Sequence, residues 1–133
     1  MLELTFQKAL TERDVRDIRA SVQKEASQRG LGPQQGFVLL FVVDELCCNV
    51  MEHGKARWVD LKVEASAAGF RMTLHDDGVP FNTATHTVDA MNEDLKLQND
   101  RRVGLTLVGR LVDELKYQRT DEGFNKVELI RTF

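Results

Sequence analysis

The sequence predicts an α+β fold with two layers, in which helices cover one face of a mostly antiparallel, mixed sheet. Apolar residues recur at helical spacing in some stretches and alternate strictly with polar residues in others. These segments follow one another in the order β, α, α, β, β, loop, α, β, β, so that neighbouring strands can pair directly. The chain has 133 residues, which is enough for one core, and we expect a single domain over residues 1–133.

The first part of the chain predicts one strand and one amphipathic helix. Apolar and polar residues alternate over residues 2–6, and Thr11 with Asp14 three residues later is typical of a helix start. One helical face then holds Val15, Ile18, Val22 and Ala26. We expect Gly30 to end this helix and Pro33 to lie in the first turn of the next one.

Residues 37–54 (FVLLFVVDELCCNVMEHG) are long, apolar and free of proline, and they predict one buried helix. Glu45 and Asn49 are four residues apart and therefore share one face, which begins with Phe37 and Phe41. Burying an unpaired carboxylate or carboxamide costs roughly 1–3 kcal/mol, so a partner should lie over this face. The simpler alternative is that Glu45 and Asn49 are half-buried and bond each other or the backbone.

A hairpin with an inward-facing carboxylate is predicted in the middle of the chain. Residues 59–63 and 70–74 alternate strictly, and residues 65–69 form the turn between them. One further step of the second strand places Asp76 on the apolar side, just before Gly78. Alternatively, Asp76 caps an ordinary turn. The same alternation predicts the last two strands, near residues 115–119 and 127–129.

Residues 82–102 have weak periodicity and many polar side chains, and they predict a long loop with at most a helical turn near residues 88–91. A loop of this length inside a small domain is usually functional or mobile. A third helix is expected to begin at Gly104. Arg101 and Arg102 precede that start, where a helix dipole disfavours cations, so they either hold a bound anion such as phosphate or are solvated.

Composition excludes some classes of partner. The net charge of −3 gives no reason to expect nucleic acid or an anionic membrane, and no apolar run approaches the roughly 20 residues of a membrane span. Cys47 and Cys48 are adjacent within a helix, where their side chains diverge, so we interpret them as core residues in a reducing compartment. No signal peptide is recognisable, and we expect a cytoplasmic protein.

Three polar clusters follow one another along the chain. Residues 45–54 read ELCCNVMEHG, residues 76–82 read DDGVPFN, and residues 104–108 read GLTLV. In this order and spacing they resemble the sequence boxes of the Bergerat-fold (GHKL) ATPase superfamily, in particular its anti-sigma-factor serine/threonine-protein kinase branch. Tyr117 and Asn125 are similar to the branch's C-terminal signature. The resemblance implies a Bergerat fold, which is the α+β sandwich predicted above, and a histidine-kinase-like ATPase domain.

The resemblance also implies ATP or ADP and Mg²⁺ as cofactors. Asn49 would bind Mg²⁺ through its amide oxygen, because Mg²⁺ commonly takes one or two protein oxygens. Asp76 would accept a hydrogen bond from the exocyclic amine of adenine. Glu45 would be the catalytic general base that takes the proton from an attacking serine hydroxyl.

The remaining contacts to the nucleotide are implied in the same way. Residues 82–102 would form a lid over the phosphates, the helix N-terminus at Gly104 would hold them, and Gly78 would let the base approach the backbone. The implied nucleotide-binding residues besides Asn49 and Asp76 are His53, Gly78, Pro80, Phe81, Arg102, Gly104, Leu105 and Thr106.

The function implied is that of an ATP-binding regulator of transcription. Such a kinase, a transferase, binds a sigma factor or an anti-sigma antagonist and phosphorylates the antagonist on serine with Mg-ATP; a homodimer is compatible with this role. The alternative is a nucleotide-sensing, protein-binding module without phosphotransfer, because residues 101–103 are Arg, Arg and Val where the family usually has glycines. A third possibility is a relic of the fold that binds no nucleotide and acts through protein contacts only.

Overall fold

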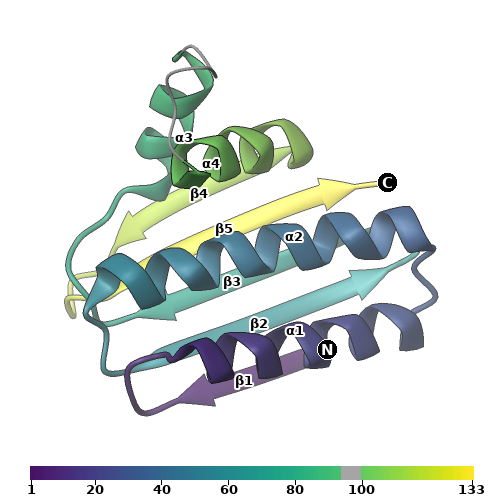
Figure 1. Ribbon diagram of the computed structural model, residues 1–133, viewed down its shortest axis with the longest axis horizontal. Coiled ribbons are helices and arrows are strands. Elements are labelled where there is room, and N and C mark those ends of the chain that lie inside the picture. Colours follow the sequence, from purple (N-terminus) through teal and green to yellow (C-terminus); the bar gives the residue numbers. More distant parts are fainter. Residues whose placement is uncertain (94–99) are drawn as a thin grey trace.

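The computed structural model describes residues 1–93 and 103–133 fully and, for residues 100–102, the backbone alone. In this part of the chain five strands form one sheet in the order β1-β2-β3-β5-β4, and every pairing is antiparallel. Helices cover one face of the sheet (Figure 1), so the predicted two-layer α+β class is confirmed. The elements are β1 (Leu2–Phe6), α1 (Glu12–Gln28), α2 (Pro33–Asn49), the π-helix η1 (Val50–Gly54), β2 (Val59–Ser66), β3 (Gly69–Asp76), α3 (Thr83–Met91), α4 (Asp100–Leu111), β4 (Glu114–Arg119) and β5 (Asn125–Thr132).

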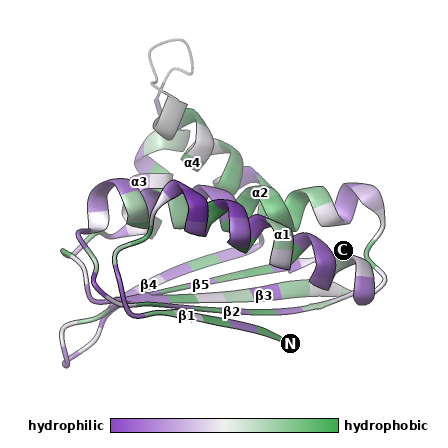
Figure 2. Cartoon of the chain, turned by 60° about the horizontal axis from the view of Figure 1, so that its bottom comes forward, coloured by the Kyte–Doolittle hydropathy of each residue, from purple (hydrophilic) through white to green (hydrophobic). Residues whose placement is uncertain are grey.

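The sheet has one apolar and one polar face. Figure 2 shows the helices together on one side of the sheet, and no described helix lies on the other side. In β2, Val59, Leu61 and Val63 are buried, whereas Asp60 and Lys62 between them are partly exposed. This alternation is what a sheet with one covered face requires, and it explains why the period of two was readable in the sequence.

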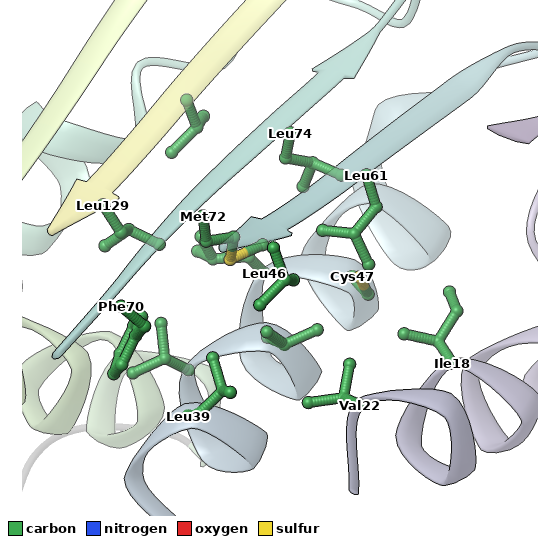
Figure 3. Close-up of a cluster of buried hydrophobic side chains, with 14 of the residues drawn as sticks. Ile18, Val22, Leu39, Leu46, Cys47, Leu61, Phe70, Met72, Leu74 and Leu129 are labelled. Atoms are coloured by element: carbon green, nitrogen blue, oxygen red, sulfur yellow. The ribbon is translucent and has the colours of Figure 1, made fainter. Parts of the chain in front are cut away.

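The core lies between α1, α2 and the covered face of the sheet (Figure 3). Ile18 of α1, Leu39 and Leu46 of α2, and Met72 of β3 are each at most 2% exposed. Truncating such a side chain to alanine typically costs about 2–5 kcal/mol. This packing fixes α2 against the sheet, and with it the position of the polar residues in its last turns.

The expected helix ends are found at both ends of α1. The Thr11 side chain accepts a hydrogen bond from the Asp14 amide (3.3 Å), and the Asp14 carboxylate accepts one from the Thr11 amide (2.9 Å). The Thr11 amide is also the main reason that the pKa of Asp14 is lowered. Gly30 has a φ of +77°, which glycine adopts without strain, and Pro33 begins α2.

The expectation of one buried helix over residues 37–54 needs two corrections. The α-helix ends at Asn49 and continues as the wider turn of η1, after which Lys55 reverses the chain with a φ of +50°. Phe37 is 65% exposed and stacks on Phe41 at 6.2 Å. Phe37 lies near the start of α2 and, unlike Phe41, does not pack against the core.

The third helix starts earlier than expected. Gly104 lies inside α4, which begins at Asp100. Residues 101–103 are Arg, Arg and Val, and each costs less in a helix than glycine, by up to about 1 kcal/mol. The chain therefore forms one additional helical turn before Gly104.

The segment predicted as a loop contains a further helix. α3 spans Thr83–Met91, where only a turn near residues 88–91 was expected. Asn82 caps it by accepting a hydrogen bond from the Thr85 amide (2.9 Å), a local signal that the weak periodicity obscured. The prediction of a loop is wrong for α3 and for the start of α4; residues 94–99 lie outside the described part of the chain.

Candidate functional site

A small cavity lies where the end of α2 and η1 meet the end of β3 and the start of β5. Its volume is about 30 Å³, enough for a water molecule but not for a purine ring. A larger ligand would therefore have to open it. The cavity is lined by Leu46, Asn49, Val50, His53, Gly54, Leu74, Asp76, Val79, Phe81, Thr83, Asn125 and Val127. The structure thus brings together four of the residues selected from the sequence: Asn49, His53, Asp76 and Phe81.

Asn49 is the unusual polar residue of this cavity. Its side chain is 7% exposed, and its Nδ2 is buried without a hydrogen-bond partner in the described part of the chain. An unsatisfied buried polar group costs about 1–3 kcal/mol. The partner that the sequence required over this face is therefore absent from the described residues around Nδ2, and a ligand in the cavity could provide it.

Asp76 faces the same cavity from the end of β3, as the alternation predicted. It is 4% exposed, and its Oδ1 accepts hydrogen bonds from the Gly78 amide (2.9 Å) and from Asn125 Nδ2 (3.0 Å). Burial raises the pKa of Asp76, and these two hydrogen bonds partly oppose that shift. Both bonds reach Oδ1, which leaves Oδ2 as the oxygen that a ligand could use.

Gly78 lies behind Asp76 and is not part of the cavity wall. A Cβ on Gly78 would stand 2.8 Å from the carbonyl carbon of Gly54, so the two loops can meet only because Gly78 has no side chain. The next amide, that of Val79, donates to the Gly54 carbonyl oxygen (2.8 Å). In this structure Gly78 allows the two loops to contact each other, whereas the expected role was to let a base approach the backbone. Pro80 is exposed and does not line the cavity.

Aromatic rings form part of the cavity wall. Phe81 stacks on His86 of α3 with centroids 4.2 Å apart and rings 2° from parallel. The ring of His53 lies 6.3 Å from that of Phe81, measured between centroids. Phe81 and His53 both line the cavity.

The third sequence cluster does not reach this cavity. Leu105 and Thr106 are buried in α4, and neither they nor Gly104 line the cavity. Because α4 begins at Asp100, the Gly104 amide lies past the first four amides, which alone lack a partner within a helix. Gly104 therefore cannot offer the free helix N-terminus expected of it. The side chain of Arg102 lies outside the described residues.

Glu45 also lies away from the cavity wall, one helical turn before Asn49. It is half-buried under α4, and a Cβ on Gly104 would stand 2.6 Å from its carboxylate carbon. Gly104 thus lets α4 approach α2 at the level of Glu45. The structure brings Glu45 and Gly104 into contact with each other, whereas the predicted roles required both to face the ligand.

Asn125 is a cavity residue that the sequence analysis named only as part of a signature. It is 4% exposed, lines the cavity and binds Asp76. It is in phase with Val127 and Leu129, which are buried on the same face of β5. A polar residue at a core-facing position of the last strand was the signal that could have identified it, as it did for Asp76.

The described residues offer few side chains that could ligate a metal ion. In the described part of the chain, no three or more His, Cys, Asp or Glu side chains gather where they could hold a metal ion. A magnesium ion at Asn49 would thus have few protein ligands, which is normal for Mg²⁺ bound mainly by phosphate and water. No described helix has both the length and the apolar character needed to cross a membrane.

Comparison with known proteins gave a family and a group of solved structures of similar fold, two of which are described below. The family model described as histidine kinase-like ATPase domain matches residues 8–131. A chain of the SiaB-SiaC complex from Pseudomonas aeruginosa superposes with a TM-score of 0.69 at 12% identity, over 96% of this chain and 88% of that one. A structure of the RsbU and RsbW domains of Rv1364c from Mycobacterium tuberculosis gives 0.62 at 18% identity, over 99% of this chain and 33% of that one. At these identities the two structures support the fold alone. No curated protein matches the chain.

Proposed function

Because the chain belongs to the histidine kinase-like ATPase domain family, we propose that it binds ATP or ADP with Mg²⁺ at the cavity between Asn49 and Asp76. We further propose that it uses ATP to phosphorylate a regulatory protein on serine or threonine. The observation on which this rests is that a buried amide with an unsatisfied nitrogen and a buried carboxylate face one cavity. Burying two such polar groups at an empty apolar site costs free energy of folding, and hydrogen bonds to a polar ligand would offset that cost.

Recognition of the base is assigned to Asp76. Its Oδ2 can accept a hydrogen bond from an exocyclic amine, and the apolar side chains of Leu46, Val50 and Leu74 would contact the ring. Because the cavity holds only about 30 Å³, binding of a base requires its wall to move. The rings of Phe81 and His53 belong to that wall, and we propose that they are displaced when the base enters.

Metal binding is assigned to Asn49. Rotation of its amide exchanges the positions of oxygen and nitrogen, so the group can present the oxygen that Mg²⁺ requires. When bound, the ion would neutralise charge on the phosphates. Asn49 would hold that ion, and through it the orientation of the phosphates relative to Glu45.

The general base of this proposal is Glu45. A carboxylate can take the proton of a serine or threonine hydroxyl when it lies within about 3 Å of that group. Glu45 shares the helical face of Asn49, but its carboxylate lies against Gly104 in this structure. Phosphotransfer would therefore require α4 to withdraw from α2 and expose the carboxylate to the substrate protein.

The proposed partner is a regulatory protein, either a sigma factor or an anti-sigma antagonist. The resemblance of the sequence clusters to anti-sigma-factor kinases supports this class, and one structural neighbour was solved as a complex of two proteins. A cytoplasmic location and an independence from nucleic acid and membrane belong to the same proposal. A homodimer remains compatible with it.

A second candidate function is nucleotide sensing without phosphotransfer. It is favoured by the contact between Gly104 and Glu45 and by the additional helical turn through residues 101–103. Both features place α4 over the proposed base. If α4 stays there when nucleotide binds, the protein would bind ATP and a partner but transfer nothing.

The first experiment measures thermal unfolding against Mg-ATP concentration. At 100 times the Kd, ligand binding should stabilise the protein by about 2.7 kcal/mol. A melting temperature that stays constant up to millimolar Mg-ATP would reject nucleotide binding and favour a relic that acts by protein contacts.

The second experiment separates the two candidates. The protein is incubated with labelled ATP and candidate antagonist proteins, and phosphoserine or phosphothreonine is detected. Transfer that is lost in Glu45→Gln and kept in the control Glu52→Gln, an exposed acid on η1, supports the kinase. Tight binding of ATP without transfer to a partner that forms a stable complex supports the sensor, and undiminished transfer in Glu45→Gln would exclude Glu45 as the base.

A further inference from the structure

The residues of the C-terminal signature form a hydrogen-bonded cluster centred on Asn125 in the cavity wall, for which the proposed chemistry gives no role. Asn125 Nδ2 donates to Asp76 Oδ1 (3.0 Å) and to the carbonyl oxygen of Val79 (2.9 Å). Asn125 Oδ1 accepts from the Tyr117 hydroxyl (2.6 Å) and from Arg119 Nη1 (3.2 Å). The cluster joins β4 and β5 to the end of β3 and to the loop that follows it.

The hydrogen-bonding capacity of Asn125 is completely used. A carboxamide has two N–H donors and an oxygen with two lone pairs, and all four are engaged in the contacts above. Tyr117 and Arg119 both donate to the oxygen, so the NH₂ group must face Asp76. The orientation of the amide is therefore fixed by two side chains of β4, and the reversed orientation would oppose donors to donors and acceptors to acceptors.

This fixed orientation determines which oxygen of Asp76 is available. Oδ1 receives both the Asn125 amide and the Gly78 amide, so Oδ2 is left for the cavity. Arg119 Nη1 also donates to the Gly78 carbonyl oxygen (2.8 Å) and so holds the loop that carries the Gly78 amide. One carboxylate oxygen is thus bound by two donors, while the other has no such contact and could accept a hydrogen bond from a ligand.

We propose that Asn125, held by Tyr117, is a positioning residue that sets the base selectivity of the site. By fixing the Asp76 carboxylate with Oδ2 as the free acceptor, it favours a purine with an amino group at that edge and disfavours a purine with a carbonyl there. The inference rests on the proposed function, because it assumes that the cavity admits a nucleotide base. It goes beyond that function by assigning selectivity between bases to the residues that orient the Asp76 carboxylate.

The test compares the affinities of ATP and ITP, which carry an amino group and a carbonyl at the same ring position. Dissociation constants are measured by calorimetry with Mg²⁺ for the wild type, Asn125→Asp, Tyr117→Phe and the control Lys126→Ala. Lys126 is the next residue of β5 and its side chain lies toward the opposite face of the sheet. We expect the wild type and the control to prefer ATP at least about tenfold, the effect of one hydrogen bond to a charged acceptor.

Asn125→Asp keeps the size of the side chain but replaces the N–H donor that faces Asp76 Oδ1 by a carboxylate oxygen, which is an acceptor. Two facing carboxyl groups must share a proton, which disturbs the acceptor offered at Oδ2. The ratio of ITP to ATP dissociation constants should therefore fall toward one. Tyr117→Phe removes one of the two donors that orient the amide and should lower the ratio severalfold. A purely structural role would weaken both nucleotides equally and leave the ratio unchanged.

A wild-type ratio in either folded variant overturns the inference, while the proposed function stands. If Asn125→Asp does not fold, the ratio in Tyr117→Phe decides alone, because that change removes only a hydroxyl. Failure of the wild type to bind either nucleotide would overturn the proposed function and this inference with it.

Discussion

Gly104 of α4 lies directly against the carboxylate of Glu45 on α2, so closely that a Cβ on Gly104 would stand 2.6 Å from the carboxylate carbon. The contact joins the first and third polar clusters of the sequence. It also covers the group that we propose as the general base. Substitutions at this contact and around the cavity should therefore affect stability and activity to different extents, and measuring both shows which residues serve folding and which serve function.

Gly104→Ala should change activity more than stability. The added methyl group meets the end of a flexible side chain, which can move aside, and alanine is favoured over glycine in a helix by about 1 kcal/mol. We expect the free energy of unfolding to change by less than about 1 kcal/mol and phosphotransfer to fall, because Glu45 is displaced. Urea unfolding and a transfer assay measure the two effects. The matched control is Gly36→Ala in α2, where the new Cβ meets Ala26 at an ordinary 3.8 Å and activity should be kept.

Gly78→Ala should destabilise the fold strongly. Here the new Cβ would stand 2.8 Å from the backbone carbonyl carbon of Gly54, and a backbone cannot yield as a side chain can. Overpacking of this kind costs about 1–3 kcal/mol, with the loss of the hydrogen bond from Val79 to Gly54 in addition. Thermal and urea unfolding should show this loss. Stability equal to that of Gly104→Ala would mean that the two loops are not in the contact described.

Asn49→Leu should stabilise the protein while removing its ligand binding. The substitution replaces an amide with an unsatisfied buried nitrogen by an apolar side chain of similar size. We expect a gain of about 1 kcal/mol, measured as a higher melting temperature without nucleotide. Calorimetry should show that Mg²⁺ no longer strengthens the binding of ADP. Wild-type affinity for Mg-ADP in this variant would contradict the role assigned to Asn49.

Asp76→Asn should have an effect on stability that depends on pH. Burial raises the pKa of Asp76 in the folded protein above its unfolded value, so the folded protein binds this proton more tightly. Its contribution to stability is therefore full below the unfolded pKa and is lost as the pH rises through the folded pKa. The variant has no such group, so the melting temperature of the variant relative to that of the wild type should rise as the pH increases above the unfolded pKa of about 4. A difference in melting temperature that stays the same at every pH would contradict this prediction.

The same Asp76→Asn variant tests recognition of the base. An amide cannot present the acceptor that a carboxylate presents without exchanging its oxygen away from the Gly78 amide. The affinity for ATP should fall at least about tenfold while the fold is retained. Circular dichroism confirms the fold and calorimetry measures the affinity. An unchanged affinity for ATP would mean that adenine is not read by Asp76.

Short sequence patterns predicted a structural feature correctly wherever that feature is fixed by residues close together in the chain. The capping box at Thr11, the turn at Gly30 and the inward phase of Asp76 were all predicted and all are found. The family suggested by the polar clusters is confirmed by the match to the histidine kinase-like ATPase domain. The cap, the turn and the phase of Asp76 each depend on residues a few positions apart, whose geometry a helix or strand fixes by itself.

The errors have a common origin. Gly104 was expected to start a helix because the apolar helical pattern begins there, but residues 101–103 also form helix and α4 begins at Asp100. Phe37 was expected to be buried because residues 37–54 are strongly apolar, but it is 65% exposed. In both cases the apolar pattern was read correctly, but such a pattern does not state where a helix begins or which part of it is covered.

The sequence by itself determined that five strands and the helices α1, α2 and α4 form, which of their faces are apolar, and that polar groups at Asn49 and Asp76 point toward the core, because side-chain direction follows from the backbone period. Only the tertiary structure decided that the cavity is small, that α4 lies on Glu45, and that Asn125 and Tyr117 hold one oxygen of Asp76. These relationships join segments far apart in the chain, and their distances are set by how closely the packed elements approach one another.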